Sequence, residues 1–188
     1  MGESPSETDE ALAARVQQGD ERAFAEIMGR YEPKLLRYGR KFMSDSENIL
    51  DAVQDVFIKV YQNIKSFDSS RRFSPWIYRV AHNIFVNALR KKTNEPITLL
   101  DFDTLIAHQI YEDPIQAEKE KAEMSVLLSR GLEKLPASHR EVLILHYLED
   151  LSYQDIADIL HVPMGTVGVR IHRARAALKK QFSPQSQL

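Results

Sequence analysis

Residues 151–181, LSYQDIADILHVPMGTVGVRIHRARAALKKQ, carry the pattern that decides the fold of the last third of the chain. Ser152, followed three residues later by Asp155, has the form of a capping box and predicts a helix over 153–160. The turn residues HVP follow at 161–163, and a basic helix is predicted over 164–180. Two short helices joined by such a turn, the second of them basic, are typical of a helix-turn-helix.

The second of these helices has one apolar face and one face suited to DNA. Val167, Ile171 and Ala174 recur at helical spacing and are expected to point inward. The opposite face combines guanidinium groups, which bind phosphates or guanine edges, with an aliphatic side chain that can contact a thymine methyl. A basic helix on a solvated surface is the alternative. The candidate duplex-binding residues are Thr166, Val169, Arg170, His172 and Arg173.

Two further helices are predicted upstream of this motif. Ser138 and Glu141 have the spacing of a second capping box and predict a helix that opens at Ser138. A leucine-rich run over 127–135 predicts another helix, which ends at Pro136. Residues 125–182 are therefore expected to form one compact helical domain, followed by a short tail at 183–188.

The first half of the chain is helical as well. Apolar residues spaced by three or four positions predict helices over 24–42, 47–65 and 74–92. Pro33 is expected to kink or break the first of them. Residues 1–10 have no apolar period and are predicted to be disordered. Residues 11–93 are therefore expected to form a separate helical domain.

The segment between the two domains differs in composition. Residues 94–124 contain eight acidic and two basic side chains, two prolines and little periodicity, which predicts a flexible acidic linker. Such a segment is either a solvated spacer or a mimic of nucleic acid that lies in a basic channel of a partner. The fold class expected from the whole pattern is all-α, with two helical domains joined by this linker.

Composition excludes several classes of protein. The chain has 188 residues and no cysteine, so disulfides and thiolate metal sites are excluded. It contains no apolar run of transmembrane length and no signal-peptide pattern, which predicts a cytoplasmic protein. His146 and Glu149 are spaced as in di-metal bundles, but one such pair is too few for a site. The sequence contains no recognisable set of catalytic residues. We therefore expect that the protein is not an enzyme and that it binds neither a metal nor a cofactor.

The net charge of −2 is unevenly distributed. Residues 66–93 carry six basic side chains and one acidic side chain, which indicates an anion-binding surface. On the helix predicted over 74–92, an aromatic, two arginines and two asparagines share one stripe, a combination that suits unpaired bases. Trp76 is equally consistent with a place in the core. The candidate residues are Arg71 and Arg72 in the preceding loop, and Trp76, Arg79, Asn83, Asn87 and Arg90 on the stripe.

Two carboxylates define a third candidate surface. Asp51 and Asp55 are four residues apart, so both lie on one face of the helix predicted over 47–65, with Gln54 beside them. A partner helix with arginines could bind this face. The alternatives are a solvated face and a pair of carboxylates that binds a metal or does acid–base work, although no nearby histidine or third acid supports the latter two.

Several motifs, taken in order, resemble the bacterial RNA polymerase sigma factors of the extracytoplasmic-function (ECF) class. Residues 19–24 (GDERAF), 51–57 (DAVQDVF) and 73–83 (FSPWIYRVAHN) are similar to region 2 of these factors. Residues 135–143 (LPASHREVL), 147–157 (YLEDLSYQDIA), 165–167 (GTV) and 170–175 (RIHRAR) are similar to region 4. The resemblance extends over residues 11–182.

This resemblance implies a transcription initiation factor, not a catalyst, that binds core RNA polymerase, directs it to promoters with −35 and −10 elements and helps to melt them. The family segment matching 51–57 docks on polymerase, which assigns Asp51, Gln54, Asp55 and Phe57 to that contact. The family helix matching 74–92, with its preceding loop, holds a flipped base of the melted −10 strand, to which Asn83 contributes. The family linker lies near the polymerase active site. An anti-sigma factor is implied as a further partner, and no direct membrane insertion is expected.

Two alternatives from other classes stay open at this point. A DNA-binding repressor or activator would use only the helix-turn-helix and would leave the stripe on the 74–92 helix unexplained. A metal-dependent helical enzyme would need acid and histidine clusters that are missing. The chain also departs from the family pattern: Gly168 and Val169 replace a basic and a small polar residue, and His161 stands where glycine is frequent in the turn.

Overall fold

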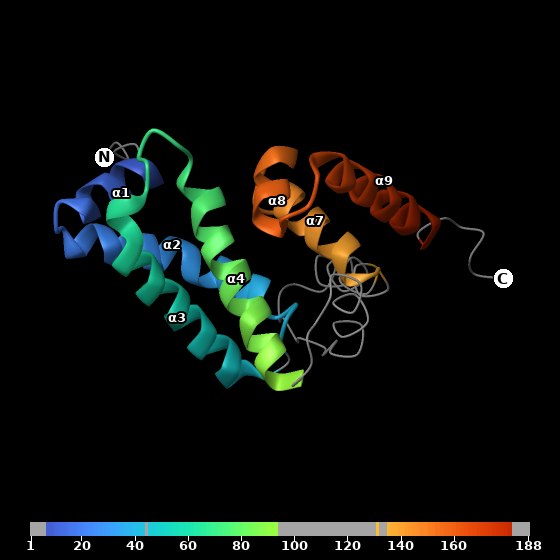
Figure 1. Cartoon of the computed structure of the whole chain (residues 1–188), viewed down its shortest axis with the longest axis horizontal. Coiled ribbons are helices and arrows are strands. Elements are labelled where there is room, and N and C mark those ends of the chain that lie inside the picture. Colours follow the sequence, from blue (N-terminus) through green and yellow to red (C-terminus); the bar gives the residue numbers. More distant parts are fainter. Residues whose placement is uncertain (1–6, 44, 94–130, 132–134, 182–188) are drawn as a thin grey trace, which may run out of the picture. The chain divides into compact units, whose positions relative to one another are not determined.

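A computed structural model describes residues 7–43, 45–93, 131 and 135–181, and all regular elements in these ranges are helices (Figure 1). The chain divides into two compact units, residues 1–95 and 96–188. The predicted all-α fold with two helical parts is therefore confirmed. The predicted linker at 94–124, the tail at 183–188 and most of the helix predicted over 127–135 lie outside the described residues.

The first unit is a helical bundle in which α1 packs on α2, α2 on α3 and α3 on α4 (Figure 1). A short 3-10 helix, η1, follows α3 directly. The loop of residues 67–72 then leads into α4. The bounds of these elements are α1 Asp9–Gln17, α2 Glu21–Gly39, α3 Ser46–Asn63, η1 Ile64–Ser66 and α4 Phe73–Thr93.

Aromatic rings form the centre of the first unit. Tyr38, which the periodicity places on the inner face of α2, packs edge-on against Tyr78 with ring centroids 5.4 Å apart. Its ring also contacts Phe42 at 5.2 Å and Phe85 at 5.8 Å. All four side chains are almost completely buried. Tyr78 and Phe85 of α4 thus join the core on the side of the helix opposite its exposed polar residues.

Helix α2 runs without interruption from Glu21 to Gly39, so of the two effects expected of Pro33, a kink or a break, the break is wrong. Pro33 is exposed, so water can hydrate the carbonyl of Gly29 that the missing proline N–H leaves without a helical partner. The helix ends before Phe42, which lies in the turn that follows and still reaches the core. Helix α2 therefore ends at Gly39, three residues before the C-terminal end of the helix that was predicted over 24–42.

The N-terminal boundary needs a correction of two residues. Asp9 and Glu10, expected in a disordered segment, form the first turn of α1. The Thr8 side chain caps this turn by accepting a hydrogen bond from the N–H of Ala11, at 3.3 Å. Residues 1–6 lie outside the described ranges.

Gly39 lies where three helices of the first unit approach each other. A Cβ at this position would lie 3.1 Å from Cγ2 of Ile49 on α3 and 3.3 Å from the ring of Phe85 on α4. We expect Gly39→Val to lower the free energy of unfolding by about 1–2 kcal/mol through overpacking, measured by urea denaturation. Gly29→Ala on the same helix is the matched control, because nothing lies within 4 Å of its Cβ position. That substitution should raise stability through helix propensity, and equal losses in both variants would contradict the packing argument.

Over residues 135–181, the second unit contains α7 Ala137–Tyr147, α8 Tyr153–Leu160 and α9 Met164–Gln181, with α9 packed on both other helices. The capping box at Ser152 and Asp155 is confirmed in both of its hydrogen bonds. The box predicted at Ser138 and Glu141 is wrong. Helix α7 begins at Ala137 after Pro136, no side chain caps it, and both predicted capping residues are buried within the helix. Proline fixes the backbone angle that a helix start needs, so a capping side chain is not required there.

The turn between α8 and α9 places His161 in the left-handed region, with φ 53° and ψ 43°. Glycine adopts this conformation without the steric cost that a Cβ brings. We expect His161→Gly to raise the stability of the chain by about 1 kcal/mol, measured by thermal unfolding. His161→Ala keeps a Cβ and should give no such gain; an equal gain would show that the imidazole rather than the backbone limits stability.

Candidate nucleic-acid and polymerase-binding surfaces

The acidic face of α3 is exposed as the sequence predicts. Asp51, Gln54 and Asp55 all point to solvent. Two large apolar side chains flank them on the same helix, Leu50 with 44% and Ile58 with 54% of their surface exposed. Apolar side chains next to charged ones on an exposed helix face are typical of a docking surface for another protein.

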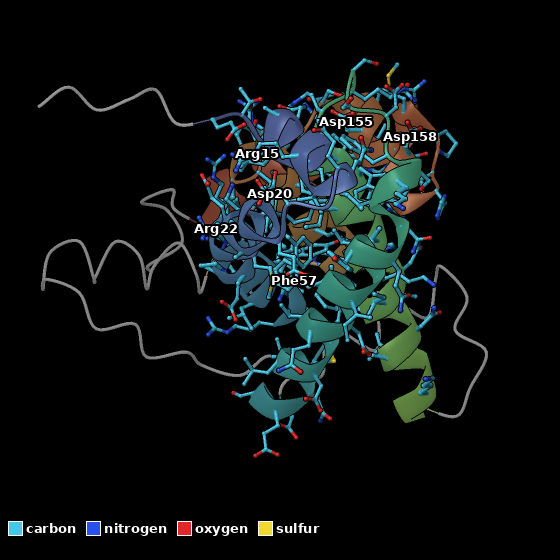
Figure 2. The ribbon with its side chains drawn as sticks, turned by 90° about the vertical axis from the view of Figure 1, so that its left-hand side faces the viewer. Arg15, Asp20, Arg22, Phe57, Asp155 and Asp158 are labelled. Carbon is cyan, nitrogen blue, oxygen red and sulfur yellow. The ribbon has the colours of Figure 1, made fainter. Side chains whose placement is uncertain are left out.

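Phe57 does not belong to this face. Its side chain is only 4% exposed and packs edge-on against Phe24 of α2, with ring centroids 6.4 Å apart. Figure 2 shows Phe57 among the helices of the first unit. The expected direct contact of Phe57 with polymerase is therefore corrected to a role in the core, where it supports α3.

The stripe on α4 is exposed along most of its length. Arg79, Asn83 and Asn87 have exposed side chains, whereas Ile77 and Ala81 on the other face of the helix are buried. The side chain of Arg90 lies outside the described part of α4. The described stripe therefore presents one guanidinium and two amides, which can reach phosphates and base edges together.

Trp76, for which the sequence allowed two roles, is half-buried. Its ring contacts Phe67 at 5.2 Å and Phe73 at 5.6 Å between centroids. The indole therefore takes part in an aromatic cluster under the loop and keeps part of its surface exposed. A half-buried aromatic of this kind is suited to stack on an unpaired base.

The loop before α4 carries the two predicted arginines in exposed positions. Asp68 orders the loop: its Oδ1 accepts hydrogen bonds from the N–H of Ser70 at 3.0 Å and from the Ser70 hydroxyl at 2.6 Å. These hydrogen bonds from Ser70, together with the nearby guanidinium of Arg71, hold the pKa of the Asp68 carboxyl below its usual range. The charged form of the carboxylate is thus the one that the hydrogen bonds from Ser70 favour.

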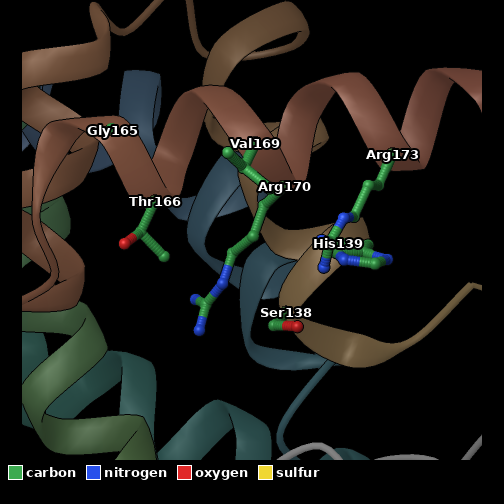
Figure 3. Close-up of a pocket in the computed structure, with 7 residues that line it drawn as sticks. All are labelled: Ser138, His139, Gly165, Thr166, Val169, Arg170 and Arg173. Carbon is green, nitrogen blue, oxygen red and sulfur yellow. The ribbon is translucent and has the colours of Figure 1, made fainter.

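The predicted duplex-binding face of α9 lines an open pocket with a volume of about 390 Å³. Four of the five predicted residues contribute to it: Thr166, Val169, Arg170 and Arg173. In Figure 3 the side chain of Arg173 extends from α9 toward His139 of α7. His172, the fifth, is exposed but does not line the pocket. Val167, Ile171 and Ala174 are buried, as their spacing predicts.

Ser138 and His139 of α7 complete this pocket and were missed by the sequence reasoning (Figure 3). Helix α8 and its flanking turns lie between these two residues and α9 in the sequence. No periodic pattern connects the two segments. The start of a helix carries partial positive charge, so the pocket joins two arginines to a helix N-terminus. Such a combination favours an anionic ligand such as a nucleic-acid backbone.

The described ranges contain neither a metal-ligating cluster nor a membrane-spanning helix. No group of three or more His, Cys, Asp or Glu side chains that could hold a metal ion occurs there. Of the pair considered in the sequence, Glu149 is buried, and Nδ1 of His146 lies 2.9 Å from the carbonyl oxygen of Leu151. None of the described helices is both long and apolar enough to cross a membrane.

Comparison with protein families matches both units separately. The family model for sigma-70 region 2 matches residues 27–95, and the model for sigma-70 region 4 matches residues 125–178. These ranges contain all three surfaces: the acidic face of α3, the α4 stripe with its loop, and the pocket face of α9. The match to region 2 begins after α1, within α2.

Curated relatives match nearly the whole chain. The ECF RNA polymerase sigma factor SigW of Bacillus subtilis is 37% identical over 176 residues, covering 89% of this chain and 93% of the relative. The ECF RNA polymerase sigma-E factor of Haemophilus influenzae is 36% identical over 183 residues, covering 94% and 96%.

Two solved structures have the same fold. CnrH, solved with the cytosolic domain of CnrY, aligns with a TM-score of 0.64 at 25% identity, covering 93% of this chain and 96% of that chain. The sigma factor RpoE from Bartonella quintana, solved with the anti-sigma factor NepR, aligns with a TM-score of 0.66 at 25% identity, covering 84% and 95%. The matched regions, their order along the chain and the near-complete coverage of the relatives agree, and the chain belongs to the ECF sigma factors, which are transcription initiation factors of RNA polymerase.

Proposed function

We propose that the three surfaces divide the work of promoter recognition between them. The acidic face of α3, with Asp51, Gln54 and Asp55, binds core RNA polymerase. The α4 stripe and the basic loop before it bind the melted −10 strand, and the pocket face of α9 binds the −35 duplex. Residues 11–93 and 125–182 are then the two functional domains, joined by the acidic segment 94–124.

The observation that carries this proposal is that side chains suited to DNA are exposed on two separate units, and the two sets differ in kind. The α9 face contains arginines on a helix-turn-helix, which fits a duplex groove. The α4 face contains Arg79, Asn83 and Asn87 beside a half-buried indole, which fits unstacked bases. A repressor that uses one helix-turn-helix has no need of the second set.

An anti-sigma factor is proposed as a further partner. The support comes from two solved relatives of the same fold, CnrH and RpoE, which were each captured with a protein partner, the second of them an anti-sigma factor. The exposed apolar side chains Leu50 and Ile58 next to the acidic face of α3 would also be available to such a partner whenever polymerase is absent.

Purified full-length chain mixed with core RNA polymerase tests the proposed function. We expect the chain to co-elute with core on gel filtration and to enable transcription from a specific start site on a genomic fragment library. Core alone is the control. Tight, sequence-specific binding of the free chain to duplex DNA at physiological salt, without co-elution, would instead support a repressor that acts through α9 alone.

A further inference from the structure

Helix α1 contacts both ends of the loop that precedes α4. At the beginning of the loop, Nε2 of Gln17 donates hydrogen bonds to the carbonyl oxygens of Ile64 and Phe67, at 2.8 Å and 2.7 Å. At the end, Oε1 of Glu10 accepts a hydrogen bond from the N–H of Phe73, the first residue of α4, at 2.9 Å. Two side chains of one helix therefore fix the points where residues 68–72 leave and rejoin the bundle.

The ends of the loop are also joined beneath it. The rings of Phe67 and Phe73 pack edge-on, with centroids 5.3 Å apart and planes at 89°, and both side chains are buried. Tyr31 of α2 contacts the ring of Phe73 at 5.5 Å. Between these fixed ends, residues 68–72 are exposed and available to a ligand.

Helix α1 is held in place by contacts that do not involve the loop. The carboxylate of Asp9 accepts hydrogen bonds from the hydroxyl of Tyr31 and from Nη1 of Arg30, both at 2.6 Å. At the other end of α1, Arg15 donates to Asp20, the residue that caps α2 (Figure 2). Leu12, Ala13 and Val16 bury the apolar side of the helix. Glu10 and Gln17 therefore reach the loop from a helix that is already anchored.

We infer that Glu10 and Gln17 are positioning residues for recognition of the −10 strand: they hold the loop 68–72 and the first turn of α4 in the geometry that discriminates between bases. This inference rests on the proposed role of the loop and α4. There are two physical reasons. An exposed loop that is ordered before binding loses less conformational entropy on binding. A hydrogen-bond donor of the loop or of α4 that is displaced by about 1 Å loses most of its contact with a base.

The test uses holoenzymes made from full-length chain and core RNA polymerase. A pool of bubble templates, with the −10 strand randomised, is bound, and the bound fraction is sequenced. The measured quantity is the enrichment ratio between the best and the worst base at each position. We expect the double variant Glu10→Ala/Gln17→Ala to lower this ratio about fivefold or more, the scale of one good base contact, while binding of core polymerase and of −35 duplex is unchanged.

Three control variants separate positioning from stability. Glu10→Gln keeps an oxygen that can accept from the Phe73 N–H, and it should restore the discrimination that Glu10→Ala loses. Gln18→Ala replaces the exposed neighbour of Gln17 and should behave as wild type. Ile49→Val weakens the core at the far end of α3 and should lower the melting temperature without changing the enrichment ratio.

Amide exchange provides a readout that does not depend on DNA. The Phe73 N–H should exchange faster in Glu10→Ala than in wild type, and Glu10→Gln should restore its protection. A wild-type enrichment ratio near one would overturn the proposed −10 role of the loop and, with it, this inference. Two outcomes would overturn the positioning role alone, provided that wild type discriminates between bases. In the first, the double variant keeps the wild-type enrichment ratio; in the second, Ile49→Val lowers that ratio as much as the double variant does.

Discussion

Replacing both Asp51 and Asp55 with lysine is expected to weaken binding of the chain to core RNA polymerase by about 2–5 kcal/mol, the range for breaking charge-assisted contacts in a partly desolvated interface. Both side chains are exposed and lie on one face of α3, so helical content should stay unchanged in circular dichroism. The measurement is a titration of labelled chain with core polymerase at two salt concentrations. Wild-type binding should weaken with salt, and the variant should show less of this dependence.

A second double variant controls for the change in net charge. Glu21 and Glu32 are exposed acids on α2, and their replacement with lysine alters the charge of the chain by the same amount. This control should bind core nearly as well as wild type, because it leaves the α3 face intact. Equal losses in the two double variants would show that core senses the overall charge, and the docking face proposed on α3 would be wrong.

The second large effect separates the two helices that are proposed to bind DNA, α9 and α4. Arg170→Ala is expected to lower capture of fully duplex promoters, because Arg170 lines the pocket face of α9. Asn83→Ala is expected to leave closed complexes near wild type and to reduce base discrimination on a pre-melted −10 bubble by about 1–3 kcal/mol, the value of a good base contact. The physical reason is that α9 offers a groove-binding face, whereas the exposed amide of Asn83 suits an unstacked base. Footprinting of both holoenzymes on duplex and bubble templates measures the two effects.

Arg175→Ala is the matched control for the α9 variant. Arg175 is an exposed arginine of the same helix that does not line the pocket, so its loss removes the same charge without removing the proposed contact. We expect it to cost less than Arg170→Ala on duplex templates. If Arg170→Ala and Asn83→Ala reduce binding equally on both templates, then the division of labour between α9 and α4 is contradicted.

Local features of the sequence were sufficient to predict most helices and much of the candidate site. The capping box at Ser152 and Asp155 acts over three residues, and the left-handed backbone of His161 is a property of one position, so both can be read without a tertiary structure. The exposed faces of α3, α4 and α9 follow from the helical period, because the period reports which side chains share a side. Two local predictions were wrong: the break at Pro33 and the capping box at Ser138. Pro33 is exposed, so water can hydrate the carbonyl it leaves without a partner, and Pro136 begins α7 without a capping side chain.

The sequence by itself thus determined the helices, their faces and, through its motifs, the family of the chain. The tertiary structure alone decided which helix ends meet. It joined Ser138 and His139 to the face of α9 and brought Glu10 to the N–H of Phe73 across 63 positions of sequence. The physical reason is that periodicity and capping act within a few residues. Contacts between helices depend on packing, which no local pattern encodes.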